Sequence, residues 1–396
     1  MDIELAKKIA RFGLCDACLG RQFINIEATD NKERGKKIRE ALNIEESQQC
    51  WLCDGLIDDI PLMAELAIDA LKDYEFSTFL VGCKIDEEIL LKEHRIATEA
   101  SESIKREIDR EIGKIIAREM NKLPDFKNPD IVVTIDTTCY DVEIDSKSIY
   151  IYGRYRKLVR NLPQTKWPCR HCNGLGCIYC NFTGKMYEES VEELIAFPAL
   201  KASMASSESF HGAGREDIDV RMLGNGRPFI LELKQPKKRN IDLKKLEKEI
   251  NEYAKGKVEV LGLRFSSKEE VRKIKEAKHP KIYMVKIGYT KKEKIYEAVN
   301  ALIGREISQA TPTRVLHRRA DIVRKRKILD IKIKEMKMNE ATLIVKAESG
   351  TYIKELMTGD GGRTKPSLAS LAGDEVKVLE LDVIGIGDEN EKVERI

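Results

Sequence analysis

The sequence lacks any hydrophobic run that approaches the roughly 20 apolar residues a membrane-spanning helix requires. Its first residues, Met1 to Lys8, also lack the long apolar core of a secretory signal peptide. Neither charge sign predominates, because 70 lysines and arginines face 67 aspartates and glutamates. We therefore expect a cytoplasmic protein with no membrane partner. The net charge of +3 does not by itself indicate nucleic-acid binding, and no internal repeat or low-complexity tract occurs.

Most of the ten cysteines fall into pairs separated by two residues. In a reducing compartment, this spacing indicates metal ligation rather than disulfides. The first two pairs are Cys15 with Cys18 and Cys50 with Cys53. Because each pair directs two thiolates at one ion, the two pairs together complete a tetrahedral four-sulfur site, and the pattern predicts a structural zinc. Two unrelated redox motifs or plain buried cysteines are the alternative.

A second and more compact group lies in mid-chain and comprises Cys169, Cys172, Cys177 and Cys180. Two glycines between its pairs, Gly174 and Gly176, permit the sharp turn that brings the pairs together. The spacing predicts a second structural zinc. His171 lies between two ligands and is expected to face solvent. The two remaining cysteines, Cys83 and Cys139, stand alone and are expected in the core.

The first half of the chain shows helix and strand patterns in turn. Hydrophobic periodicity predicts a helix over 57–74, a strand over 76–85, a long helix whose isoleucines recur on one face from Ile104 to Ile115, and strands over 131–135, 141–144 and 148–152. The segment 153–157 then interleaves basic and aromatic residues, as an RNA-contacting surface does. A solvated strand edge is the alternative interpretation of that segment.

The second half is expected to begin near residue 185, with a helix that Ser190 opens. Gly224-Asn225-Gly226 precedes an apolar strand and predicts a β-hairpin turn. Strands are then expected over 258–265, 282–287, 329–333 and 341–345, and helices over 243–253, 267–277 and 291–303. With 396 residues, 42% hydrophobic and 35% charged, the chain is predicted to be a globular α+β protein of two or three domains.

The segment Phe210–Arg221 combines small residues with an Arg-Glu-Asp run. Gly212 and Gly214 permit backbone angles that larger residues resist, and they let another molecule approach closely. A cation beside Asp217, which the sequence offers in Arg215, would keep that carboxylate ionised in a dry pocket. Such an arrangement suits a nucleophilic or basic aspartate. A surface turn whose acid and base simply pair in solvent is the alternative.

Two basic runs contain no matching acids. The first, Arg324 to Lys327, follows the segment 309–321, which itself includes Arg318 and Arg319. The second comprises Lys234, Lys237, Lys238 and Arg239. Runs of this density can neutralise several phosphates, which favours RNA binding, whereas a solvated charged face is the alternative.

The loop Gly214-Arg215-Glu216-Asp217 resembles the Gly-Arg-Thr-Asp-type active-site loop of pseudouridine synthases. The longer strings 214–221 and 224–229 are similar to the Pus10 family, and further matches follow in the expected order, at 281–283, 309–321, 350–355 and 362–364. The segment around Thr78 to Gly82 resembles a THUMP domain, a module that generally holds RNA. The resemblance implies a zinc-binding segment over 1–60, a THUMP-like domain over 61–165, and a pseudouridine synthase domain with a mixed, mainly antiparallel sheet over 185–396. The second zinc cluster, which the cysteine spacing predicts and the resemblance supports less firmly, is expected over 166–184.

The same resemblance implies an activity, namely the isomerisation of uridine 55, often also 54, in the TΨC arm of tRNA. Asp217 is then the nucleophile, with Asp219 as its main rival, and attack at the ribose C1′ or at the base C6 are both open. No catalytic cofactor and no protein partner are implied. The substrate-binding residues would be Tyr283 and Tyr352 as stacking groups, Lys354 as a partner of the Asp217 carboxylate, and Arg215, Arg318 and Arg319.

Other functions compete with this interpretation. A non-catalytic zinc and THUMP protein that binds tRNA, such as a chaperone, would share the first half of the chain. A THUMP-bearing enzyme of different chemistry is a third possibility. A methyltransferase is disfavoured, because no glycine-rich cofactor loop follows a strand in the second half.

Overall fold

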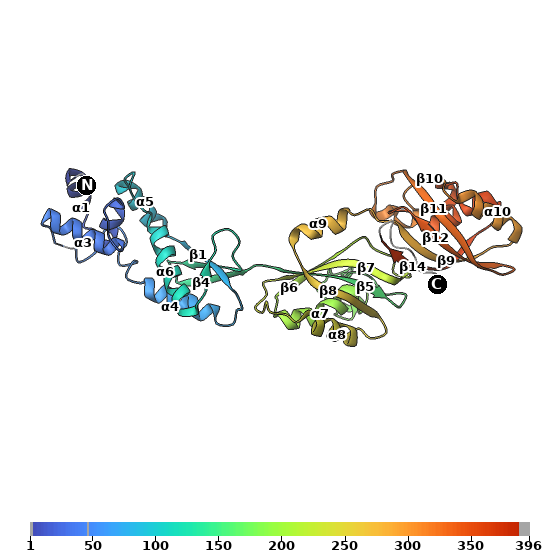
Figure 1. Cartoon of the computed structure of the whole chain (residues 1–396), viewed down its shortest axis with the longest axis horizontal. Helices are drawn as coiled ribbons and strands as arrows, with labels where there is room; N and C mark the ends of the chain where they lie inside the picture. The colour runs from blue at the N-terminus through green and yellow to red at the C-terminus, as the bar shows by residue number, and fades with distance from the viewer. Residues whose placement is uncertain (1–2, 46, 388–396) are drawn as a thin grey trace. The chain divides into compact units, whose positions relative to one another are not determined.

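The computed structural model describes residues 3–45 and 47–387, and of Arg318 it describes the backbone alone (Figure 1). Contacts between residues divide the chain into two units. Unit 1 comprises Met1–Ser148 and Lys234–Asn240, and unit 2 comprises Ile149–Leu233 and Ile241–Ile396. Within the described ranges, no helix combines the length and the apolar composition that a membrane crossing requires.

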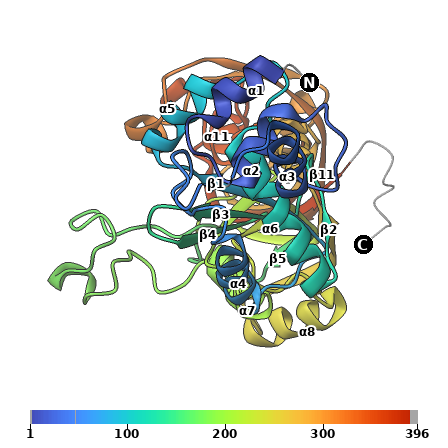
Figure 2. The same ribbon diagram turned by 90° about the vertical axis from the view of Figure 1, so that its left-hand side faces the viewer.

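Unit 1 contains a helical segment followed by an α/β segment. Its elements are α1 (Ile3–Ala10), α2 (Asp16–Gly20), η1 (Arg21–Phe23), α3 (Asn31–Leu42), α4 (Ile60–Leu71), β1 (Thr78–Lys84), α5 (Glu87–Ile96), α6 (Ile104–Met120), β2 (Leu123–Pro124), β3 (Ile131–Asp136) and β4 (Asp141–Ser146). The four strands form one sheet in the order β2-β1-β3-β4, and only the β3–β4 pair is antiparallel. Helices α4 and α6 pack on this sheet (Figure 2).

The predicted isoleucine stripe forms the buried face of α6. Ile104, Ile108, Ile112 and Ile116 are fully buried, whereas Ile115 is half-buried. Ser103 begins the helix, because its side chain accepts a hydrogen bond from the backbone N–H of Arg106. Residues four positions apart lie on one face of a helix, so the stripe packs as a continuous row against the sheet.

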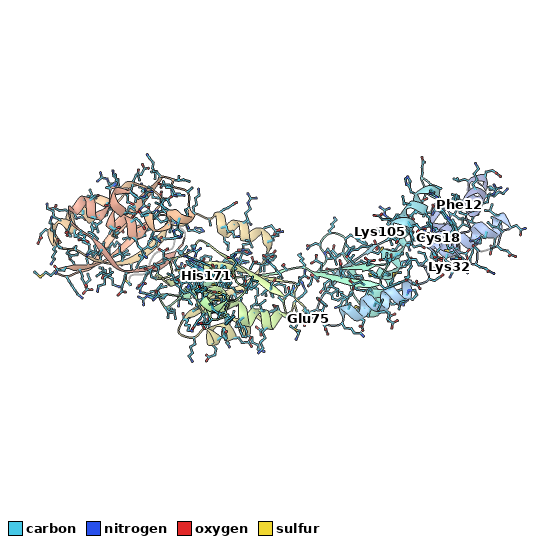
Figure 3. All side chains as sticks on the ribbon, turned by 180° about the vertical axis from the view of Figure 1, so that it is seen from behind. Phe12, Cys18, Lys32, Glu75, Lys105 and His171 are labelled. Atoms are coloured by element: carbon cyan, nitrogen blue, oxygen red, sulfur yellow. The ribbon has the colours of Figure 1, made fainter. Side chains whose placement is uncertain are left out.

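Helices α2 and α3 cross at unusually close range. A Cβ added to Gly20 would lie 1.8 Å from the carbonyl oxygen of Asn31, and one added to Gly35 would lie 1.9 Å from that of Asp16. Only glycine leaves room for this backbone contact. The crossing fixes the loop before α2, which holds Cys15, and α2 itself, which holds Cys18 (Figure 3).

Unit 2 is built on one large sheet. Its elements are β5 (Ile149–Lys157), η2 (Ile178–Cys180), α7 (Val191–Ser203), β6 (Ser207–Gly212), β7 (Arg221–Lys234), α8 (Leu243–Tyr253), β8 (Val258–Ser266), α9 (Lys268–Glu276), β9 (Lys281–Gly288), α10 (Lys292–Leu302), β10 (Glu306–Gln309), η3 (Thr313–Arg318), β11 (Arg324–Met336), β12 (Glu340–Ala347), α11 (Ile353–Thr358), η4 (Asp360–Gly362), β13 (Thr364–Lys365), α12 (Leu368–Ala372) and β14 (Lys377–Ile386). The strand order is β13-β10-β11-β12-β9-β14-β7-β5-β8, with β6 paired to β7.

Along this path, the β14–β7 pair is parallel and the other neighbours are antiparallel. The sheet is therefore mixed and mainly antiparallel, which confirms the predicted α+β class.

Strand β5 belongs to this sheet and not to the sheet of unit 1. The sequence pattern placed its first residues, 148–152, directly after β3 and β4. In the structure, β5 pairs with β7 on one side and with β8 on the other. Alternation within a strand indicates which face is buried, but it does not specify the partner strand, so the sequence could not assign the sheet.

The predicted hairpin at Gly224-Asn225-Gly226 is wrong, because β7 runs without a break from Arg221 to Lys234. Instead, the strand bulges there: Tyr155 and Lys157 of β5 face Arg227 and Met222 of β7, so three residues on β5 span six on β7. Gly224 has a φ of +59° and a Cβ at this position would lie 1.8 Å from the carbonyl oxygen of Ile384. Because Gly224 has no side chain, β14 can pack against the bulge. The glycine does not reverse the direction of the chain.

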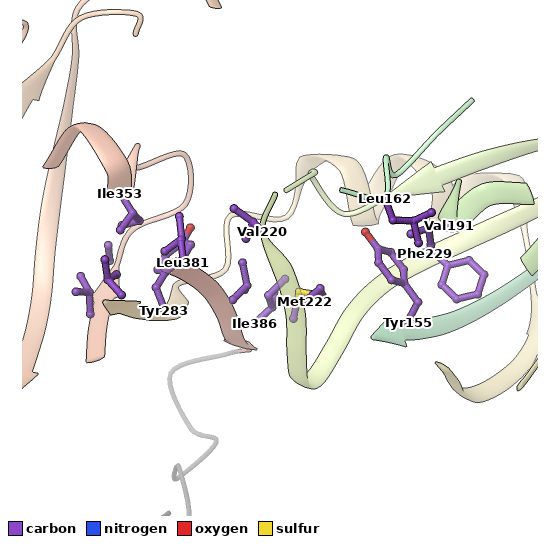
Figure 4. Packing of buried hydrophobic residues seen from close by; sticks show 14 of the residues in the cluster. Tyr155, Leu162, Val191, Val220, Met222, Phe229, Tyr283, Ile353, Leu381 and Ile386 are labelled. Atoms are coloured by element: carbon purple, nitrogen blue, oxygen red, sulfur yellow. The ribbon is translucent and has the colours of Figure 1, made fainter. Parts of the chain in front are cut away.

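One hydrophobic core continues beneath the loop that precedes β7 (Figure 4). Tyr155 and Phe229 mark one part of it, Val220 and Met222 the middle, and Tyr283 another part, where Ile353 and Leu381 lie close by. Because Val220 is buried directly after the loop, the loop is fixed to the core at its C-terminal end.

Candidate active site and metal centres

A cavity of about 560 Å³ opens in unit 2 between the β6–β7 loop, β9, η3 and the start of α11. It brings together residues that are far apart in the sequence. Its lining includes six of the predicted site residues, namely Asp217, Tyr283, Tyr352, Arg215, Lys354 and Arg319. The seventh, Arg318, ends η3, and its side chain lies outside the described residues.

Asp217 lies in the loop before β7 and is half-buried. Arg314 donates from Nη1 to the Oδ1 atom of Asp217 over 2.9 Å. Lys354 lies further away, with Nζ 3.7 Å from the Oδ2 atom. The cation that stabilises this carboxylate is therefore Arg314, whereas Arg215 is exposed and forms no ion pair within the described part of the chain.

Arg314 is itself held in place by Glu355. Its Nε donates to the Oε1 atom of Glu355 over 2.7 Å, and the Glu355 side chain is almost fully buried in α11. Burial alone would lower the pKa of the guanidinium, but the hydrogen bonds and charges of Glu355 and Asp217 raise it above the usual value. A permanent, oriented positive charge thus faces the Asp217 carboxylate.

The rival aspartate, Asp219, is engaged by Lys354. The lysine Nζ lies 2.7 and 2.9 Å from the two carboxylate oxygens, closer than to Asp217. Burial would raise the pKa of Asp219, but the hydrogen bonds and charge of Lys354 outweigh it and lower the pKa. Lys354 therefore bridges the two aspartates and binds Asp219 more closely.

Glu216 anchors the loop on its inner side, a role that the sequence did not reveal. This buried carboxylate accepts a hydrogen bond from Arg227 Nε at 2.8 Å and one from the Tyr155 hydroxyl at 3.0 Å. Gln164 donates to the same hydroxyl at 2.8 Å and to the carbonyl oxygen of Gly214 at 3.0 Å. The charge-paired network behind the loop thus fixes the backbone from which Asp217 projects.

Lys157, at the end of β5, holds the same backbone. Its ammonium donates to the carbonyl oxygens of Leu162, Ile218 and Asp217 over 2.9 to 3.2 Å. Burial lowers the pKa of this lysine to about 8, with the charge of Glu216 opposing the shift. An isolated lysine in a strand gave no signal of this role; its alternation with inward-facing Tyr155 was the sole hint.

Two tyrosines line the cavity in different ways. Tyr283 lies on β9 and is almost fully buried, and its hydroxyl has no hydrogen-bond partner among the described residues. Burial raises the pKa of Tyr283 to about 12, so the phenol is protonated near neutral pH. Tyr352 is fixed by Gln309, whose side-chain amide bonds its backbone N–H and carbonyl at 2.9 Å each, and its hydroxyl accepts from Arg319 at 3.0 Å.

The first cysteine group could hold one metal ion. Its sulfurs, on Cys15, Cys18, Cys50 and Cys53, all lie within 4.8 Å of one another, and the Cys15–Cys53 pair is 3.9 Å apart. Four sulfurs about 2.3 Å from a tetrahedral ion lie about 3.8 Å apart, so the geometry fits. Contacts among the sulfurs, together with burial, raise the pKa of Cys18, and a bound cation would offset this.

The second group fits the same geometry. The Cys169–Cys177 and Cys172–Cys180 sulfur pairs are 3.9 Å apart, and Cys177 and Cys180 are 3.7 Å apart. The backbone N–H of Gly176 donates to the Cys172 sulfur, and those of Cys177 and Gly184 donate to the Cys180 sulfur. These bonds stabilise thiolates, the form that binds a metal. Of the two lone cysteines, Cys83 is buried as predicted, but Cys139 is exposed, so that expectation is wrong.

Comparison with known proteins places these features in a family. The model described as Pus10, C-terminal, matches residues 150–387, and the model of the archaeal Pus10 THUMP domain matches residues 63–136. A tRNA pseudouridine synthase Pus10 of Methanothrix thermoacetophila is 42% identical, over 100% of this chain and 96% of the relative. A relative of the same name from Pyrococcus furiosus is 41% identical over 99% of each chain. Among solved structures, a Cbf5-Nop10-Gar1 complex shares 16% identity over 60% of this chain and 50% of that chain, with a TM-score of 0.34, too low to support a conclusion.

The C-terminal family model matches the chain over the whole length of the mixed sheet. The second half is therefore a pseudouridine synthase domain, that is, an isomerase that acts on RNA. The similarity extends further, because full-length relatives match the entire chain at about two fifths identity. The chain belongs to the Pus10 family of tRNA pseudouridine synthases. This confirms the predicted family, the predicted enzyme class and the presence of a THUMP domain, which the family model matches at 63–136, and it disfavours a non-catalytic tRNA-binding protein.

Proposed function

We propose that this enzyme converts uridine 55, and also uridine 54, of the tRNA TΨC arm to pseudouridine, with Asp217 as the nucleophile. The observation that supports this most is the placement of Asp217. Its carboxylate faces a cavity of about 560 Å³, and Arg314 holds it from one side at 2.9 Å. Asp219, in contrast, is already bound at 2.7 and 2.9 Å by Lys354.

The chemistry needs a nucleophile and no cofactor. The Asp217 carboxylate adds to the ribose C1′ or to the base C6, the bond from N1 to C1′ breaks, the base turns, and C5 bonds to C1′. The proton leaves C5, N1 gains a proton, and the carboxylate is released, so the reaction is a net isomerisation. Arg314 would orient the carboxylate before the attack.

The tyrosines and arginines of the cavity suit a flipped nucleotide. Tyr283 offers a ring in the wall and a protonated hydroxyl that is free to bond the base. Tyr352 offers a second ring, which Gln309 and Arg319 hold in place. The cationic Arg215 and Arg319 at the cavity would contact phosphates of the arm, and Arg318 would extend this surface.

Both cysteine groups would hold structural zinc in a reducing cytoplasm. Four thiolates with sulfur separations near 3.8 Å suit Zn²⁺, which accepts sulfur ligands in a tetrahedron. All ten cysteines are free of disulfides in the described chain, in keeping with such a compartment. Zinc would fix the folds of these segments and would take no part in the isomerisation.

The test compares two neighbouring aspartates. Asp217→Asn should abolish pseudouridine formation in an unmodified tRNA transcript, by at least about a thousandfold, since it removes the nucleophile and keeps the shape. Asp219→Asn is the matched control and should retain measurable activity. Carbodiimide mapping gives the modified position, and tRNA binding should survive in both variants. Activity in Asp217→Asn together with its loss in Asp219→Asn would reverse the assignment.

A further inference from the structure

The loop that holds the second cysteine group presents large apolar side chains to solvent. Four residues form what we term the apolar rim: Leu175, Ile178, Tyr179 and Phe182 are 92%, 70%, 72% and 74% exposed. In Figure 2, green segments from this part of the chain project sideways from the rest of their unit. Apolar side chains this exposed, gathered within eight residues, indicate a binding surface rather than a core.

The rim is held on a rigid base. At the root of the loop, Pro168 and Lys185 form a β-bridge, and the Cys169 N–H donates to the carbonyl of Gly184 at 2.7 Å. Trp167 and Tyr187 pack edge to face beside it, with ring centroids 5.5 Å apart. The four sulfurs join the two turns above this base. A surface fixed in advance loses little conformational entropy when it binds.

Part of the rim already shows the geometry of ring stacking. The rings of His171 and Tyr179 are 4.1 Å apart at the centroids and lie within 16° of parallel. Both residues are exposed, so a further flat ring could extend the stack from outside. His171 is labelled in Figure 3. Phe182 adds a second exposed ring.

The loop carries no carboxylate, and one of its cations, Arg170, is available to an anionic group. From Lys166 to Met186 the sequence contains no aspartate or glutamate, although the whole chain is 35% charged. Lys166 and Lys185 pair with Glu208 and Glu193. Arg170 is exposed and forms no ion pair within the described residues.

We propose that the apolar rim stacks on unpaired bases of the bound tRNA, with Arg170 contacting a neighbouring phosphate. Every base has a flat face that an aromatic ring can cover, and single-stranded nucleic acid is bound by such rings combined with cations. The apolar rim alone would suit a protein partner equally well. A protein partner, however, would not explain why the loop contains no carboxylates. The proposal rests on tRNA being the substrate, and it adds a second contact outside the catalytic cavity.

The first experiment removes the two exposed rings from the full-length enzyme. Tyr179→Ala/Phe182→Ala should weaken binding to unmodified tRNA about 5- to 150-fold for each stacked base lost, at one fixed salt concentration. The salt dependence of binding should stay unchanged, since no phosphate contact is removed. The matched control is Phe197→Ala/Tyr253→Ala, which deletes another exposed stacked pair, with centroids 4.9 Å apart, and should leave tRNA binding as it was.

The second experiment tests the charge and locates the contact. Arg170→Gln should reduce the slope of log binding constant against log salt concentration by roughly 0.7, the value for one phosphate contact on a single strand. Dimethyl sulfate probing should show unpaired tRNA bases that wild type protects and Tyr179→Ala/Phe182→Ala leaves reactive. Metal content equal to wild type shows that the loop is intact in the variants.

Unchanged tRNA affinity and protection in the ring-deleted enzyme would overturn the proposal and assign the rim to a protein partner. Equal weakening by the control pair would overturn it as well, because the effect would then not be specific to the rim. The proposed function fails differently: wild-type enzyme would leave uridine 55 unmodified, whatever the rim does.

Discussion

The two cysteine groups have the same ligands and nearly the same sulfur geometry, but they lie in opposite surroundings. In the first group, Cys18, Cys50 and Cys53 are buried members of the hydrophobic core of unit 1. In the second group only Cys169 is buried, and it is not part of the core of unit 2. The first joins residues 38 positions apart, the second residues 8 apart. One group therefore ties the core together, and the other shapes a surface loop.

This difference shows that a ligand pattern does not determine what the bound metal stabilises. A metal that closes a long loop inside a core contributes to the folding of everything packed around it. A metal in a short, exposed loop fixes local backbone and leaves the nearby core unaffected. The contrast can be tested by removing each metal separately.

The largest effect is expected from Cys15→Ser/Cys18→Ser. Loss of the first metal should unfold α1–α3, because the close crossing of α2 and α3 is built around these ligands. Structural zinc in small domains contributes about 10–16 kcal/mol, so we expect a loss of at least about 5 kcal/mol in this region. Hydrogen exchange should show unprotected amides in α1–α3, while the amides of β7 and β9 keep their protection. Full protection of α1–α3 would contradict the integrated role of the first group.

A smaller effect is expected from Cys169→Ser/Cys172→Ser. Metal analysis should find about two zinc ions per wild-type chain and one in this variant, by the four-ligand rule. The melting temperature should change little, since the loop contributes no residue to the core. Proteolysis should become faster within the loop. Unchanged metal content would show that the second group does not bind zinc, and a large drop in melting temperature would remove the contrast between the groups.

The sequence predicted what local patterns encode. Both cysteine groups, the α6 stripe and strands β3, β9 and β12 lie where spacing and periodicity indicated. Strand β14 was missed, although it joins β9 to β7 in the middle of the large sheet. Its pairing with β9 has two register shifts, so its burial does not alternate regularly. The strands that pair with β5 could not be predicted either, because no local sequence signal encodes the pairing.

In the candidate site, too, the residues in local motifs could be predicted and the long-range contacts could not. Asp217 and Tyr283 could be named from motifs, and both line the cavity. The network around them joins residues that no spacing connects, such as Arg314 with Asp217, 97 positions apart. The basic run at 234–239 shows the reverse error, because Lys237 and Arg239 pair with Asp73 and Asp130 of unit 1 and so are not a free phosphate-binding surface.

The rate at which each cysteine group loses zinc to a chelator should also distinguish the two groups. Three of the sulfur-bearing residues in the second group are half-buried, whereas three in the first are buried. A chelator should therefore take up zinc in two phases, the first from the exposed loop, with a rate at least about tenfold faster, because opening the core requires partial unfolding. Stopped-flow absorbance of a zinc indicator measures both phases. The Cys169→Ser/Cys172→Ser variant should lack the fast phase, and a surviving fast phase would contradict the assignment.

The smallest effect is expected from a single methyl group in the second loop. Gly176 has a φ of +91°, and a Cβ there would lie 2.8 Å from the carbonyl oxygen of Phe182. Gly176→Ala should therefore weaken zinc binding by strain of about 1–2 kcal/mol from the left-handed backbone, plus the contact with that carbonyl. Gly174→Ala is the matched control, because its φ is +95° but its nearest contact would be an ordinary 3.7 Å to the Pro168 side chain. Competition with a chelator of known affinity should rank the chains as wild type, then Gly174→Ala, then Gly176→Ala. If both variants bind zinc equally weakly, backbone strain alone limits the loop, and the close approach of Phe182 has no part in forming the site.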